Sequence, residues 1–71
     1  MKISKFTKPD LDYFREQCNF VGFEKDLFEM RSEGIPLQII AENYGYTRRG
    51  LDNVSKEVNN KIKRVLELRK I

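Results

Sequence analysis

A stripe of apolar residues at helical spacing runs through the last third of this 71-residue chain. Its members are Leu51, Val54, Val58, Ile62, Val65 and Leu66. Residues that recur every three or four positions share one face of an α-helix, so the stripe predicts an amphipathic helix from Arg48 to Lys70, about 34 Å long. Thr47 is a good capping residue ahead of it. Because this helix uses so much of a short chain, the other segments must pack against its apolar face to form one small core.

The first of three shorter helices is predicted at about residues 8–19. Thr7 can cap it, Pro9 suits its first turn, and Asp10 can reach back toward the cap. Asn19 ends the segment. The apolar face of this helix comprises Leu11, Phe14 and Cys18.

Glycine and proline mark the limits of the other two helices. One runs from Phe23 to Ser32, before Gly34, and the next opens at Pro36 and stops at Gly45. The apolar positions of the latter are Leu37, Ile40, Ala41 and Tyr44. The buried centre expected for the domain comprises Leu27, Phe28, Ile40, Ala41, Leu51, Val54, Val58 and Ile62. The predicted fold is therefore a small all-α domain of four helices.

Composition argues against several functional classes. The chain has no histidine and a single cysteine, so neither a disulfide within the chain nor a histidine or multi-cysteine metal site is expected. Nothing in the sequence resembles a phosphate-binding or dinucleotide-binding loop, so we expect no enzyme and no cofactor. Cys18 fits a small core residue better than a nucleophile. With no signal-like leader and no apolar run long enough to cross a membrane, a cytoplasmic protein is expected.

The positive charge is concentrated in the second half of the chain. Residues 1–34 contain six Lys and Arg against seven Asp and Glu, whereas residues 35–71 contain eight against four. The net charge is +3. This asymmetry indicates a polyanionic partner that meets the second half.

The last two helices are joined by the short turn Gly45-Tyr46-Thr47. A turn this short makes the helices cross steeply, and Ala41 is small enough for their closest approach. This spacing is typical of a helix-turn-helix. An ordinary helical hairpin has short glycine turns too, so this spacing alone leaves both interpretations open.

The face of the last helix opposite its apolar stripe carries basic and amide side chains from Arg49 to Arg64, and Glu67 comes late enough to lie past the groove. Arginine suits guanine and asparagine suits adenine, so Arg49 and Asn53 are the predicted base contacts. The predicted phosphate contacts are Arg48, Lys56, Asn60 and Lys63. Arg64 lies on the same face, and Asp52 on its flank is expected to pair with Lys56. We therefore expect a double-stranded DNA-binding protein, a transcriptional regulator whose recognition helix enters the major groove.

Residues 20–62 resemble region 4 of bacterial sigma factors and the similar LuxR/GerE-type domain. The resemblance rests on an acidic helix at residues 24–30, on Ser32-Glu33-Gly34, and on the stretch from Ile40-Ala41-Glu42 through Gly45-Tyr46-Thr47. It implies that residues 48–63 enter the major groove and that the preceding helix braces them. Residues 6–20 are similar to the start of small regulators carried by phages and mobile elements. The expected organisation is one domain over residues 1–71, with a helix-turn-helix core at about 23–63 and an extension at 64–71.

The sequence departs from this family pattern at four positions. Pro36 and Ile39 replace the residues of a capping box, so the start of the third helix lacks its usual cap. Gly50 and Ser55 replace a common threonine and leucine, which rotates the expected packing of the last helix toward Val54.

Two questions stay open at this point. An adaptor that binds a protein, such as RNA polymerase or another regulator, is the alternative function, and exposed Ile39, Leu68 and Ile71 would support it. The late apolar residues from Val65 onward either cover the first helix or form a homodimer contact.

Overall fold

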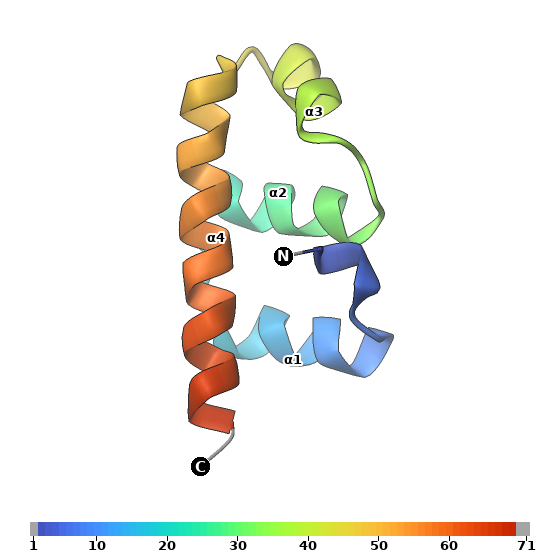
Figure 1. Cartoon of the computed structure of the whole chain (residues 1–71), viewed down its shortest axis with the longest axis vertical. Helices are drawn as coiled ribbons and strands as arrows, with labels where there is room; N and C mark the ends of the chain where they lie inside the picture. Colours follow the sequence, from blue (N-terminus) through green and yellow to red (C-terminus); the bar gives the residue numbers. More distant parts are fainter. Residues whose placement is uncertain (1, 70–71) are drawn as a thin grey trace.

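The protein is an all-helical domain in which three short helices lie on one side of a long one (Figure 1). The computed structural model describes residues 2–69. A 3-10 turn, η1 (Ile3–Lys5), is followed by α1 (Lys8–Gln17), α2 (Phe23–Ser32), α3 (Leu37–Tyr44) and α4 (Arg48–Arg69). Residues 2–69 contain no strand, so the predicted fold class is confirmed. The long axis of the molecule, 39 Å against 19 and 18 Å, follows α4.

The ends of α1 and α2 are set by residues with a positive φ, as the sequence predicts. Asn19 has a φ of 49° and follows the last turn of α1. Gly34 has a φ of 87°, and there the chain reverses with two hydrogen bonds: the Gly34 amide donates to the Arg31 carbonyl at 3.0 Å and the Ile35 amide to the Met30 carbonyl at 3.1 Å. These two hydrogen bonds satisfy carbonyl groups in the last turn of α2 that have no partner within the helix. α1 ends two residues before the predicted limit.

The starts of α1 and α3 differ from expectation. The Thr7 side chain makes no capping hydrogen bond to α1. Asp10 pairs with Arg69 and also reaches back to Thr7 as expected, and hydrogen bonds from Arg69 and Thr7 hold the pKa of Asp10 below its ordinary value. Pro36 is the cap residue of α3, and Leu37 is the first helical residue, so the expected opening at Pro36 is one position early. No side chain caps α3, in agreement with its missing capping box.

The core is one continuous apolar cluster. Its buried members are Ile3, Phe14, Cys18, Leu27, Phe28, Ile40, Ala41, Leu51, Val58, Ile62 and Val65. Seven of the eight residues expected at the centre are buried, and the exception, Val54, is half-buried because it lies at the edge of the α4 stripe. Phe14 connects α1 to α2 through an edge-to-face contact with Phe28, with ring centroids 6.4 Å apart. Burial of one such side chain stabilises the fold by about 1.5 to 3 kcal/mol.

The carboxyl end of α4 packs on α1 of the same chain. Val65 is buried and Leu66 is partly buried against the core. Arg69 pairs with Asp10 at 3.1 Å, and its guanidinium lies over the Tyr13 ring, 5.0 Å from the centroid. The late apolar residues therefore cover α1, which is one of the two roles expected for them. Leu68 remains exposed, and Ile71 lies outside the described residues.

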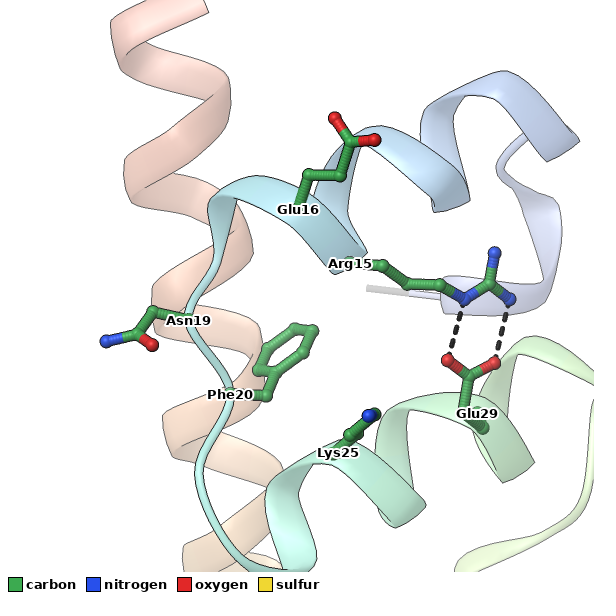
Figure 2. A pocket seen from close by; sticks show the side chains of 6 residues that line it. All are labelled: Arg15, Glu16, Asn19, Phe20, Lys25 and Glu29. Carbon is green, nitrogen blue, oxygen red and sulfur yellow. Dashed lines mark hydrogen bonds and ion pairs between the residues drawn. The ribbon is translucent and has the colours of Figure 1, made fainter.

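α1 and α2 are also joined by a two-pronged ion pair (Figure 2). Arg15 donates from Nε to Glu29 Oε2 at 2.6 Å and from Nη2 to Glu29 Oε1 at 2.7 Å. The Arg15 guanidinium beside Glu29 lowers the pKa of that carboxyl. The pair borders a shallow hollow between the two helices that Phe20 and Lys25 also line. Arg15 and Glu29 pair across the two helices, whereas Glu16 and Lys25, which also line the hollow, form no ion pair among residues 2–69.

Candidate nucleic-acid interface

The turn between α3 and α4 is fixed by one glycine and a group of aromatic rings. Gly45 has a φ of 73°, and after it the Tyr46 amide donates to the Ala41 carbonyl at 3.1 Å. Phe23 of α2 packs against Tyr44 and Tyr46, with ring centroids 5.2 and 4.7 Å apart. Ala41 is buried. The turn is thereby held onto α2, and it joins α3 to α4 at the residues that the sequence predicts.

The exposure of Tyr44 differs from what its position in the sequence predicts. Tyr44 falls on the predicted apolar stripe of α3, yet it is 54% exposed. It lies in the last turn of a short helix, where the Phe23 ring packs against it. The spacing of the apolar residues within α3 does not predict that Tyr44 is exposed.

α4 begins with the cap that the sequence predicts. The Gly50 amide donates to the Thr47 hydroxyl oxygen at 3.0 Å. A Cβ at Gly50 would lie 3.0 Å from that same oxygen, a contact that would push the hydroxyl away. Glycine at this position is therefore compatible with the cap, although it costs up to about 1 kcal/mol in helix propensity relative to alanine.

The basic residues of α4 fall into two groups. Lys61 and Arg69 face the other helices: Lys61 Nζ lies 2.6 Å from Glu24 Oε1 of α2 and 3.2 Å from the Asn19 carbonyl oxygen, and Arg69 pairs with Asp10. The Lys61 and Glu24 side chains are only 17% and 15% exposed. The acidic first half of the chain thus binds those cations of α4 that point inward.

The second group points outward. The exposed side chains on this surface are Arg49, Asn53, Lys56, Asn60, Lys63 and Arg64. Within residues 2–69, none of the four cations among them forms an ion pair. The helices α1, α2 and α3 lie to one side of α4 (Figure 1), and all six side chains are exposed, although Arg64 also borders a hollow that Gln17 and Asn19 line. We call these six residues the outer face of α4.

Arg48 belongs to neither group of basic residues, because its ion-pair partner lies within α4 itself. Its Nε donates to Asp52 Oδ1 at 3.1 Å, one helical turn further on. The expected pair between Asp52 and Lys56 is therefore wrong; Asp52 turns toward the amino end of α4 instead. Both partners remain more than half exposed, at 59% and 53%. The pair therefore lies on the flank of the outer face, and it occupies Nε of the Arg48 guanidinium.

The first turn of α4 is chemically unusual for a helix start. It holds Arg48 and Arg49 and no acidic residue. The amino end of a helix carries partial positive charge, so a cation placed there costs about 0.3 to 1 kcal/mol at the surface. Gly50 adds its own cost. Sequence features that weaken a helix locally are often retained for binding.

The other reactive and charged groups among residues 2–69 give no second candidate site of this kind. Burial raises the pKa of the Cys18 thiol, which lies in the core as expected. In the part of the chain that the structure describes, no group of three or more acidic or cysteine side chains is placed to hold a metal ion. No helix among residues 2–69 is long and apolar enough to span a membrane.

Comparison with protein-family models, with characterised proteins and with solved structures gave no significant match.

Proposed function

We propose that this protein binds double-stranded DNA in a sequence-specific manner and acts as a transcriptional regulator, with residues 48–63 of α4 in the major groove. The observation that carries the proposal is the outer face of α4: its four cations are exposed and unpaired within residues 2–69, and two amide side chains lie among them. The major groove is wide enough to admit one α-helix.

The roles of the outer face follow from side-chain chemistry. Lys56 and Lys63 are compact charges suited to phosphate oxygens, and Asn60 can donate to phosphate as well. Arg49 and Asn53 lie nearest the amino end of the helix, where a recognition helix contacts base edges. Their donors match guanine and adenine respectively. The α2 and α3 helices support this surface from behind and contribute no residue to it.

The experiment compares matched lysine variants in a duplex DNA-binding assay. Lys56→Ala or Lys63→Ala should weaken binding to every sequence, since a phosphate contact carries no sequence information. Lys25→Ala removes an equal charge from the exposed surface of α2 and should change binding much less. If all three variants lose affinity equally, net charge and not the outer face governs binding.

A second comparison tests sequence reading. The preferred duplex is first selected from a random DNA pool. Arg49→Ala and Asn53→Ala should then each cost about 1 to 3 kcal/mol on that duplex and much less on random DNA. Equal losses on both DNAs would mean that neither side chain reads bases.

The alternative function is an adaptor that binds a protein such as RNA polymerase. Ile39 on α3 and Leu68 near the end of α4 are 45% and 66% exposed, and both lie outside the outer face. Ile39→Ser and Leu68→Ser should leave DNA binding unchanged if DNA is the main partner. The adaptor takes precedence if duplex DNA is not bound while the intact chain captures a polymerase subunit that these variants fail to capture.

A further inference from the structure

Asp52 is out of place beside a surface that binds phosphates through charge alone. It is the first carboxylate of α4 and lies between Arg49 and Lys56 in sequence. More than half of its side chain is exposed. A negative charge here repels the DNA backbone whatever the base sequence, so it lowers affinity for all DNA.

Helix stability does not explain the Asp52–Arg48 pair well. Exposed ion pairs one helical turn apart contribute little, because solvent screens them and both side chains lose freedom. The order is also the less favourable one, with the cation on the amino-terminal side of the anion. We therefore expect the pair to contribute to DNA binding and not to the stability of the helix.

The geometry of the pair leaves Arg48 equipped to read a base. Asp52 accepts from Nε at 3.1 Å, and within residues 2–69 neither terminal guanidinium nitrogen of Arg48 forms a hydrogen bond. These two nitrogens are the pair that can donate side by side to O6 and N7 of guanine. A carboxylate on Nε also fixes the plane of the guanidinium, so that less freedom is lost on contact.

We propose that Asp52 is a positioning residue that orients Arg48 to read a guanine, an inference that rests on the proposed DNA binding. Arg48 is then a base-contacting residue, whereas the sequence alone assigns it to phosphate. Asp52 makes the surface more selective in two ways: it orders the reading side chain, and it weakens binding to DNA that lacks the right base.

The test measures the binding of duplexes with each of the four bases at every position of the selected site. For Asp52→Asn, binding to random duplex should tighten severalfold at low salt, because one negative charge is removed beside the phosphates. At one position, the preference for guanine should fall by about fivefold, the lower bound for a two-pronged contact. Arg48→Lys should lose the same preference, since lysine keeps the charge but lacks the planar fork.

Glu57→Gln is the matched control. Glu57 is an exposed carboxylate on α4 that forms no ion pair in the part of the chain described by the structure. This variant should tighten random binding to a similar degree and leave every base preference unchanged. Thermal unfolding of each variant verifies that the domain stays folded.

Three results are decisive. A lost guanine preference in Asp52→Asn but not in Glu57→Gln supports the proposal. If the two variants behave alike at every position, Asp52 is only a surface charge and the proposal is overturned while DNA binding stands. If the intact chain does not bind duplex DNA, the proposed function is rejected, and the role of Asp52 is rejected with it.

Discussion

Replacement of Lys61 by methionine should destabilise the domain more than any other exchange of a single α4 lysine. Lys61 connects α4 to both α2 and the α1–α2 loop, through Glu24 at 2.6 Å and the Asn19 carbonyl at 3.2 Å. Methionine keeps most of the aliphatic stem but leaves the mostly buried Glu24 carboxylate without its cation. The Val21 amide, which donates to Glu24 Oε1 at 3.1 Å, would be its remaining partner.

The magnitude follows from the partial burial of the pair. Fully exposed pairs contribute about 0.2 to 1 kcal/mol, and breaking a fully buried one costs about 3 to 5 kcal/mol. With both side chains at about one-sixth exposure, we expect a loss of about 1.5 to 3 kcal/mol, the range for hydrogen bonds to charged groups. In a domain of this size each kcal/mol lowers the melting temperature by about 4 to 8 °C.

Urea unfolding followed by circular dichroism measures this loss, with Lys56→Met as the control on the outer face. A double-mutant cycle with Glu24→Gln isolates the pair: the double variant should be more stable than the sum of the two single losses implies. Equal stability of Lys61→Met and Lys56→Met, or a coupling energy near zero, would refute the reasoning.

The same pair predicts a pH dependence. The Lys61 ammonium holds the pKa of Glu24 below its ordinary value of 4.5. A carboxyl whose pKa is lowered by folding stabilises the folded state fully above its ordinary value, and this contribution is lost as the pH falls through the lowered one. The stability difference between the intact chain and Lys61→Met should therefore shrink below about pH 4.5. A difference that is constant from neutral to acidic pH would contradict it.

Three further changes test the packing. Ala41→Leu should cost about 1 to 3 kcal/mol, since this buried position lies beside the turn, and an unchanged urea midpoint would disprove that packing. Gly45→Ala should cost about 1 to 2 kcal/mol, because its φ of 73° is strained for a residue with a Cβ; equal thermal stability would show that the turn relaxes. Removal of residues 65–71 should lower the stability of a monomer by about 2 kcal/mol or more, because the burial of Val65 is lost. If sedimentation instead shows that the intact chain is a dimer and the shortened chain a monomer, these residues form a dimer contact.

The helices could be predicted closely because their signals are local. The bounds of α2 and the start of α4 follow from glycine, threonine and the apolar period, and the structure has them at Phe23–Ser32 and at Arg48. Ile3 was missed as a core residue: it is buried by a three-residue turn that has no period to detect. Its position depends on packing against α2, which no local pattern encodes.

The residues of the candidate site could be predicted from the sequence, but the ion-pair partners of its charged side chains could not. The outer face follows from angular position along α4, and all six of its residues are exposed. The roles of Lys61 and Arg48 depend on partners instead. Lys61 pairs with Glu24, 37 residues earlier in the chain, which requires the tertiary structure. Asp52 is four residues from both Arg48 and Lys56, so spacing alone could not decide between them.

The central claim is tested most directly by the salt dependence of duplex DNA binding by the intact chain. If about four phosphates are neutralised by the outer face, the logarithm of the binding constant should fall with the logarithm of salt concentration at a slope near −4. Lys56→Ala should make that slope shallower by about one unit, and Lys25→Ala should leave it unchanged. Absence of binding at low ionic strength, or binding that does not respond to salt, would contradict the account.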